Sequence, residues 1–453
     1  MDEFHLSDAD TFTVHLEHDP LLRSTIVAIA VFDRVPKWTR FCDAVERATR
    51  IEPKFRRRIV AGSNPMLPSR WVDDLDFDLT WHIRRIAAPS PGSFDEVLEF
   101  ARVAGMTAFD PVRPRWEFTL VEGLADGTAA LVMKVHHALT DGIGGIQLAH
   151  HIVDLDRRGH HRRPVPVPPS GPSDSLAHQA SDAVAHDVGR LGSAVVGVAR
   201  AVVTDLVRRP LRFGEDVARL AGSVGRFVRP ITTTLSPVMT ERRLGWHYQA
   251  FEVPLAGLRA AAEMAAGTVN DGFLAGIAGG LACYHAEHES SVEELRVTMP
   301  ISTRTADDAE GGNRITLVRF AVPVGEHDPI SRMLAIDRTS RQWRAEPAVG
   351  WSQAIAGALN LLPTGVAAGM FKHVDVLASN VPGFDVKVFV AGARLERFYA
   401  FGPTLGASAN ITLMSYCGRC FVGVTTDSGA VPDHARFVEC IERGFLELLA
   451  VGG

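Results

Sequence analysis

The sequence predicts a mixed α/β protein made of two related lobes with a cleft between them. Runs rich in β-branched residues alternate with segments of helical periodicity in both halves of the chain. A proline-rich stretch followed by long helical patterns separates the halves, and 453 residues are too many for one compact core. We therefore expect three parts, namely a first lobe at 1–163, a connector at 164–243 and a second lobe at 244–453.

In the first part, strand patterns with β-branched residues precede a helical pattern. Strands are expected at 24–33, 116–121 and 129–135, with a helix at 38–49. After Asp141 and Gly142, apolar residues from Ile143 to Val153 recur at helical spacing, which predicts a helix directly after a strand.

The connector opens with a proline-rich segment at 164–172 that is incompatible with a helix. Two apolar stripes at three/four spacing follow, at 184–206 and 213–227. Residues 157–243 contain 14 arginines and 7 acidic residues, although the whole chain has a net charge of -6. Such a basic amphipathic segment can lie on a membrane or lipid-droplet surface. It also fits a helical crossover packed on the protein's own lobes, so both interpretations stay open.

The last part repeats the mixed pattern of the first. Strands are expected at 248–253, 295–300, 315–322, 386–390 and 411–425, with helices at 258–266 and 270–287. Cys417 and Cys420 form a CxxC inside the last expected strand, and no second pair accompanies them. We therefore expect neither a zinc site nor a redox role for them.

Composition excludes several classes of function. The net charge of -6 and a pI near 6.3 do not favour nucleic-acid binding. The acidic N-terminus does not resemble a secretory signal, and no apolar run approaches the roughly 20 residues of a spanning helix. The five scattered cysteines suit a reducing compartment. We expect a cytoplasmic protein, with peripheral attachment to the inner membrane face or lipid bodies left open.

The strongest local signal is Lys134-Val-His136-His137-Ala-Leu-Thr-Asp141-Gly142. Side chains alternate across a strand, so His136 and His137 should point to opposite faces and should not share a metal ion. One imidazole is then free to face a cleft and take a proton near neutral pH. Acyl transfer from a thioester to an alcohol needs such a general base, because a hydroxyl is a poor nucleophile until its proton leaves. Asp141 either couples to the histidine or fixes the following loop; we favour the second, with Gly142 in a tight turn.

HHxxxDG is the signature of the CoA-dependent acyltransferase superfamily, which includes chloramphenicol acetyltransferase and peptide-synthetase condensation domains. Further blocks, in order, make the chain resemble the bacterial wax ester synthase/acyl-CoA:diacylglycerol acyltransferase family over nearly its whole length outside the connector. These blocks are Leu6-Ser-Asp-Ala-Asp-Thr-Phe12, Trp71-Val-Asp-Asp-Leu-Asp-Phe-Asp78, Arg113-Pro-Arg-Trp-Glu117, Thr268-Val-Asn270-Asp271, Met299-Pro-Ile-Ser302, Gly312-Asn313, Ser379-Asn380-Val-Pro-Gly383, Gly402-Pro403 and Ser415-Tyr416.

The resemblance implies two chloramphenicol-acetyltransferase-like lobes with an active-site tunnel between them. Acyl-CoA would enter from one side, and diacylglycerol or a long-chain alcohol from the other. His137 matches the general base of the motif that also contains His136 and Gly142, and Asp141 matches its orienting acid. No metal and no cofactor are implied, since acyl-CoA is a substrate.

The resemblance also suggests four substrate-binding residues. Asn270 and Asp271 would lie near the reacting groups, although Asn270 can equally start and pin the following helix. Ser379 and Asn380 would lie on the tunnel wall. The chain departs from the family at Arg115, where leucine is usual, and at Gly272-Phe273, where aliphatic residues are usual. Both departures are expected near substrate contacts.

Three other functions compete with this one. A serine hydrolase would need a G-x-S-x-G nucleophile elbow, which the sequence lacks. A condensation-type enzyme would keep the fold and acylate an amine or a polyketide hydroxyl. A non-catalytic lipid-droplet protein would keep the fold with a degenerate site, which the intact His137, Asp141 and Gly142 argue against.

Overall fold

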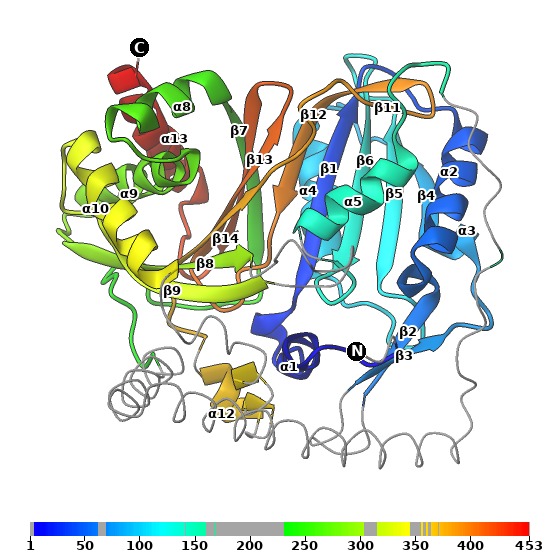
Figure 1. Ribbon diagram of the computed structural model, residues 1–453, viewed down its shortest axis with the longest axis horizontal. Coiled ribbons are helices and arrows are strands. Elements are labelled where there is room, and N and C mark those ends of the chain that lie inside the picture. Colours follow the sequence, from blue (N-terminus) through cyan, green and yellow to red (C-terminus); the bar gives the residue numbers. More distant parts are fainter. Residues whose placement is uncertain are drawn as a thin grey trace, which may run out of the picture.

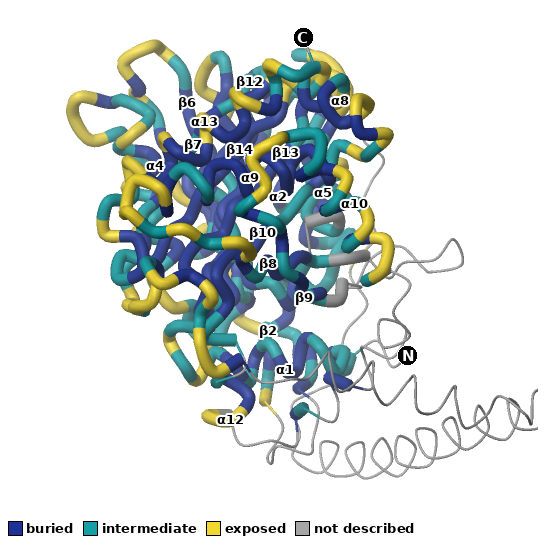
Figure 2. Tube along the Cα trace, turned by 90° about the vertical axis from the view of Figure 1, so that its left-hand side faces the viewer, coloured by how far each residue is buried: buried dark blue, intermediate teal, exposed yellow. Residues whose placement is uncertain are grey.

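The computed structural model describes residues 4–61, 69–140, 142–159, 167, 231–302, 315–344, 355–356, 359–360, 364–369 and 371–452. These residues form two six-stranded sheets, each covered by helices (Figure 1). We call each sheet with its helices a lobe, the first lobe being the one that contains β1. The strands of both sheets form the buried centre of the molecule, and exposed residues lie mainly in loops (Figure 2). The two connector stripes at 184–206 and 213–227 lie outside the described residues.

The first sheet is mixed. All its neighbouring strands are antiparallel except β4 and β5, which run parallel. In spatial order its strands are β11 (Phe389–Val390), β12 (Ala393–Phe401), β1 (Thr25–Phe32), β6 (Ala129–His136), β5 (Trp116–Glu122) and β4 (Ile83–Ala87).

The second sheet is also mixed, with β10 parallel to both of its neighbours. In spatial order its strands are β7 (Trp246–Pro254), β14 (Arg419–Asp427), β13 (Ala409–Tyr416), β10 (Val376–Val381), β8 (Glu294–Ser302) and β9 (Ile315–Pro323). A separate two-stranded sheet pairs β2 (Arg57–Val60) with β3 (Arg70–Asp73).

The last quarter of the chain completes the first sheet. β12 lies beside β1 with Val27 opposite Phe401, and β11 extends the same edge. In Figure 1 the orange β12 lies between the two lobes, next to the blue β1. Residues 389–401 therefore belong to the first sheet, although they fall within the expected segment 244–453.

The helices of the first lobe lie on both faces of its sheet. They are α2 (Trp38–Ile51), α3 (Leu79–His82), α4 (Phe94–Met106) and α5 (Gly142–Ile152). A capping box of Ser93 and Glu96 begins α4, so this start is encoded locally. α5 follows β6 directly and packs beside α2. The helix expected after Asp141 and Gly142 is thus confirmed.

The helices of the second lobe cover its outer face (Figure 1). They are α8 (Leu255–Met264), α9 (Val269–Glu287), α10 (Pro329–Arg344) and α13 (His434–Gly452). α9 and α13 approach closely because their crossing is built from glycines. A Cβ on Gly444 would lie 2.3 Å from the Gly276 oxygen and 2.3 Å from the Gly280 nitrogen. α1 (Asp8–Leu16) and α12 (Thr364–Gly369) pack together through Phe12, Leu16, Ala367 and Ala368.

The strand expected at 411–425 is wrong, because the structure has a hairpin there. β13 ends at Tyr416, and Cys417 and Gly418 turn the chain with φ values of 46° and 79°. Cys417 is half-buried in this turn, whereas Cys420 is buried in β14. The strand expected at 386–390 is limited to Phe389–Val390. Within the described ranges, no helix is both long and apolar enough to span a membrane.

Candidate active site

A cavity of about 260 Å³ lies where the two lobes meet. Its walls come from β1, β5, β6, β12 and α5 on one side, and from β8, β9, β10 and β13 on the other. Most of the lining is apolar. The main polar side chains that line it are His137, Thr140, Ser379, Asn380, Asn410 and Thr412. An apolar pocket with a few polar groups is the usual form of a site for a small or lipid-like substrate.

His137 directly follows β6 and continues the alternation of side chains along that strand, which turns it toward the cavity. Met133, Val135 and His137 line the cavity, and the intervening Lys134 and His136 do not. This alternation follows from the two-residue repeat of a strand. The His137 N–H donates to the Ser24 carbonyl at 2.9 Å, which extends the pairing of β6 with β1 by one residue.

His136 is fully buried on the opposite face of β6. Its Nδ1 lies 3.0 Å from the backbone nitrogen of Ala138, which can only donate. A neutral His136 must therefore carry its proton on Nε2, which lies 3.0 Å from the Glu17 Oε1. Both ring nitrogens are thus occupied by the protein itself, and His136 does not reach the cavity.

The rest of the HHxxxDG motif is only partly described. Gly142 is the first residue of α5, whose later residues Gly145, Ile146, Leu148 and Ala149 form part of the cavity wall. Asp141 lies outside the described residues.

Ser379 and Asn380 lie on β10 and line the same cavity as His137. The chain then turns tightly against the end of β13. A Cβ on Gly383 would lie 2.1 Å from the Ser415 carbonyl oxygen, so only glycine fits there. The Gly383 N–H also donates to the Ser415 hydroxyl oxygen at 3.2 Å. This close packing fixes the wall that carries Ser379 and Asn380.

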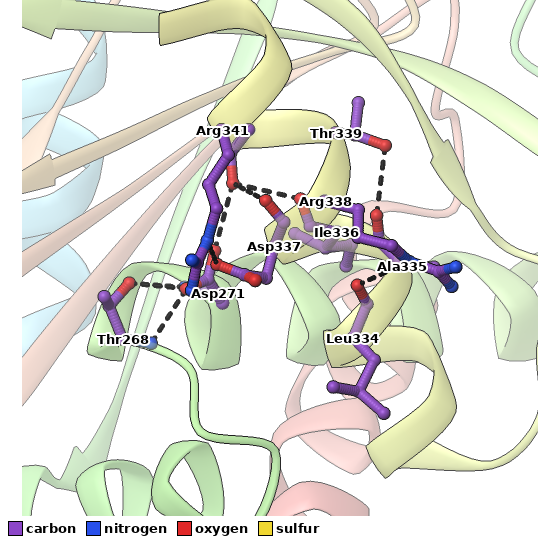
Figure 3. A network of polar contacts seen from close by, with 10 residues as sticks. Thr268, Asp271, Leu334, Ala335, Ile336, Asp337, Arg338, Thr339 and Arg341 are labelled. Carbon is purple, nitrogen blue, oxygen red and sulfur yellow. Dashed lines mark hydrogen bonds and ion pairs between the residues drawn. The ribbon is translucent and has the colours of Figure 1, made fainter.

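Asn270 and Asp271 are placed in the first turn of α9 rather than in the lining of this cavity. Asp271 closes a capping box, accepting from the Thr268 N–H at 2.8 Å and the Thr268 hydroxyl at 2.7 Å. Its other oxygen accepts from the Ser340 hydroxyl at 3.2 Å, which joins α9 to α10. Figure 3 shows Asp271 with Thr268 on one side and residues of α10, such as Asp337, on the other. The Asn270 amide nitrogen lies 3.6 Å from the Met299 sulfur.

The two departures from the family also lie away from the cavity. Arg115 points to Glu17, with its Nη1 3.0 Å from Oε2, and the adjacent Trp116 is fully buried. Phe273 is buried in the core of the second lobe, and Gly272 packs against Leu258. The described side chains at both positions serve internal packing and charge pairing, and neither position lines this cavity.

Asn410 and Thr412 are cavity residues that the sequence analysis missed. They lie two apart on β13 and so share one face, and the Thr412 hydroxyl donates to the Asn410 Oδ1 at 3.0 Å. The Asn410 amide donates to the Pro403 carbonyl at 2.7 Å. Two polar residues at a spacing of two in an apolar strand were the signal available in the sequence.

Comparison with known proteins identifies the family. The profile of the wax ester synthase/diacylglycerol acyltransferase catalytic domain matches residues 6–273, and that of the C-terminal domain of the same family matches residues 311–449. A Mycobacterium tuberculosis H37Rv protein named for diacylglycerol O-acyltransferase activity is 36% identical over 96% of this chain and 90% of its own length. Another from that strain, with a similar name, is 26% identical over 99% of this chain and 96% of its own.

Solved structures share the fold. The wax ester synthase/diacylglycerol acyltransferase of Marinobacter aquaeolei VT8 has a TM-score of 0.63 at 21% identity, covering 99% of this chain and 100% of that one. The first condensation domain of the calcium-dependent antibiotic synthetase has a TM-score of 0.63 at 14% identity, covering 100% and 96%. The two-lobed α/β fold is thereby confirmed. From the matched profiles and the level of identity, the chain belongs to the wax ester synthase/diacylglycerol acyltransferase family and is an acyltransferase.

Proposed function

We propose that this enzyme transfers a fatty acyl group from acyl-CoA to the free hydroxyl of diacylglycerol, with His137 as the general base. A long-chain alcohol offers the same hydroxyl and is the alternative acceptor, which would give a wax ester. The proposal is carried by one observation. His137 lies on the wall of an apolar cavity between the lobes, whereas both nitrogens of His136 are occupied on the other face.

The proposed reaction is a direct displacement. His137 takes the proton of the acceptor hydroxyl while its oxygen attacks the thioester carbonyl, so a C–O bond forms as negative charge develops on the carbonyl oxygen. Collapse of the tetrahedral intermediate breaks the C–S bond, and the CoA thiolate receives the proton from His137. The products are the new ester and free CoA. A thioester is reactive enough that no covalent acyl-enzyme is required, and no metal or prosthetic group enters this scheme.

Two features of the cavity support the scheme. Ser379 and Asn380 present a hydroxyl and an amide from the second lobe, and such groups can donate to the oxyanion as it forms. The apolar walls suit a fatty acyl chain, for which each buried methylene contributes about 0.8 kcal/mol. The substrates named in the proposal, acyl-CoA and a lipid alcohol, are those implied by the family.

We also propose that the enzyme works at a membrane or lipid-body surface, because its acceptor is insoluble in water. The basic stripe of Arg212, Arg219 and Arg226 in the connector would provide the contact. Charge reversal of these three arginines should weaken sedimentation with anionic vesicles. Unchanged sedimentation would exclude this surface.

The function is tested by the release of free CoA thiol from palmitoyl-CoA by purified protein, with dioleoylglycerol or hexadecanol as acceptor. We expect release that depends on the acceptor and vanishes in His137→Ala. His327→Ala removes an exposed histidine and serves as the matched control. Release without any acceptor, or equal release by His137→Ala, would contradict the proposal.

A further inference from the structure

A buried charged cluster lies directly behind His137, on the face of β6 opposite the cavity. It consists of Glu17, Arg115 and His136, whose side chains are 19%, 14% and 0% exposed. The Glu17 carboxylate follows the end of α1 and meets both partners. Its Oε2 lies 3.0 Å from the Arg115 Nη1, and its Oε1 lies 3.0 Å from the His136 Nε2. We call these three residues the Glu17 cluster.

The Glu17 cluster is joined to the backbone of His137 from both sides. The Glu17 Oε1 accepts from the Ser24 N–H at 2.9 Å, and the Ser24 carbonyl accepts from the His137 N–H at 2.9 Å. The His136 N–H donates to the Arg115 carbonyl at 3.0 Å. On the other side of His137, the Ala138 N–H donates to the His136 Nδ1 at 3.0 Å. The position of His137 therefore depends on the geometry of the cluster.

The bond from Ala138 requires His136 to be neutral. A protonated imidazole carries a proton on both nitrogens, and its Nδ1–H would then face the Ala138 N–H, donor against donor. Glu17 by itself favours that protonation, because an opposite charge within hydrogen-bond distance stabilises the charged form of a histidine. Arg115 changes the balance, since a guanidinium stays protonated and already supplies the positive charge that a buried carboxylate needs.

Arg115 is the cation that neutralises Glu17, because the other nearby cations are held by other partners. Lys134 lies on the same face of β6, but its Nζ is 3.3 Å from the Glu117 carboxylate on β5. Arg23, beside Ser24, donates to the Met106 carbonyl. Among the described residues, the imidazole also contacts the Arg115 Nη1, 3.3 Å from its Nε2, and the ring of Phe109, in an edge contact with centroids 6.0 Å apart. Burial raises the pKa of Glu17, but His136, the Ser24 N–H and Arg115 outweigh it and hold that pKa below its ordinary value.

We propose that Arg115 and Glu17 are positioning residues for acyl transfer, whose ion pair keeps His136 neutral and thereby holds the backbone that carries His137. This inference rests on His137 being the general base. It predicts that in the native enzyme the pH dependence of kcat comes from the general base alone. Removal of Arg115 adds a second pH dependence to it.

The test is the pH profile of kcat for Arg115→Met, which removes the charge but keeps a long side chain. If His136 becomes charged beside an unopposed Glu17, His137 is displaced, and between about pH 8.5 and pH 6 kcat should fall on the order of tenfold further than it does in the native enzyme. The KM for palmitoyl-CoA should change little, because the apolar residues of the cavity wall are unaltered. Arg115→Lys should keep the native profile. Glu17→Gln/Arg115→Met should regain part of the lost activity at low pH, because no uncompensated carboxylate remains.

Arg85→Met is the matched control, since Arg85 forms an exposed ion pair with Glu122 at the edge of the same sheet. It should leave the profile unchanged. The inference would be overturned if Arg115→Met kept the native profile. It would also be overturned by an equal loss at every pH that the double variant does not relieve, since that pattern indicates lost packing alone.

A second readout does not depend on catalysis. In Arg115→Met, a charged His136 would form an ion pair with Glu17 that the native protein lacks. Such a pair stabilises the fold at low pH, and its contribution is lost as pH rises and the imidazole becomes neutral. The melting temperature of Arg115→Met should therefore fall from about pH 6 to about pH 8.5, relative to the native protein, while its kcat rises. Parallel melting curves would contradict the cluster even if acyl transfer proved to use another base.

Discussion

The two lobes bury carboxylates in opposite ways. In the first lobe, Glu17 faces charged or ionisable side chains, Arg115 and His136. In the second lobe, the carboxylate of Asp375 accepts its hydrogen bonds from backbone N–H groups, with the charges of Arg296 and Arg242 nearby. Its Oδ1 accepts from the N–H groups of Leu235 and Ser236 at 3.1 and 3.0 Å, and its Oδ2 accepts from the Arg296 N–H at 2.9 Å.

Asp427 repeats the second pattern by accepting from the N–H groups of Arg243, Gly429 and Ala430. Both aspartates thus fasten residues 235–243, at the end of the connector, to strands of the second lobe. The pKa values separate accordingly. Burial raises the pKa of Asp375 and of Asp427 despite their backbone donors, whereas the pKa of Glu17 is lowered. Glu17 thus pairs with side chains directly behind His137, whereas Asp375 and Asp427 hold chain segments in place.

The sharpest test of this contrast is His137→Ala in the first lobe. Loss of a positioned general base should lower kcat by about 10²–10⁴-fold. The melting temperature should remain close to the native value, because the cluster behind His137 is untouched. CoA release and thermal melting measure the two effects. A loss of less than about tenfold would remove His137 from the role of base.

Asp375→Ala in the second lobe should show the reverse. It leaves the N–H groups of Leu235, Ser236 and Arg296 without their acceptor, at about 1–3 kcal/mol for each buried group left unsatisfied. The urea midpoint should fall markedly, while kcat of the folded enzyme stays near native. Asp375→Asn keeps one acceptor oxygen and should lose less. A large fall in kcat at native stability would place Asp375 in the site instead.

Acid should act on the two carboxylates with opposite sign. The folded pKa of Glu17 lies below 4.5, so its contribution to stability is present above 4.5 and is lost as pH falls through the folded value. The folded pKa of Asp375 lies above its unfolded value of 3.8. As pH falls from the folded pKa to the unfolded one, the folded state binds a proton that the unfolded state does not, so the protein gains stability. The measurement is the melting temperature of the native protein minus that of each variant, from neutral to acidic pH. This difference should shrink with falling pH for Glu17→Gln and grow for Asp375→Asn. Parallel differences would abolish the contrast.

A smaller effect is expected at the start of α9. Thr268→Ala and Asp271→Ala each break the capping box, and each should lower stability by about 1 kcal/mol with kcat little changed. The measurement is chemical unfolding together with CoA release. If Asp271→Ala greatly reduced kcat while Thr268→Ala did not, Asp271 would contact substrate as well as cap the helix.

The placement of His137 could be predicted from sequence because it depends on local periodicity. A strand through Val135 determines which histidine faces which side, and the residues after Gly142 carry a helical repeat. The hairpin at Cys417 was missed because a cysteine with positive φ is not a typical turn signal, although Gly418 follows it.

Long-range pairings were beyond the sequence. Glu17 and Arg115 are 98 residues apart in the chain, and nothing in the local pattern of either marks the other. The same holds for Val27 and Phe401, which pair across the first sheet. Asp271 could be interpreted in two ways from the sequence. The spacing from Thr268 to Asp271 is a helix-capping signal, and the same residues also fall inside a family motif.

The pairing of β12 with β1 has a consequence for how the molecule holds together. A cut anywhere in the connector would sever the chain without separating the lobes, because the first sheet keeps a strand that belongs to the later fragment. The earlier fragment, made alone, would present the bare edge of β1, a surface prone to pairing with other chains. The two fragments should therefore associate when they are mixed, through the pairing of β1 with β12 that places Val27 opposite Phe401.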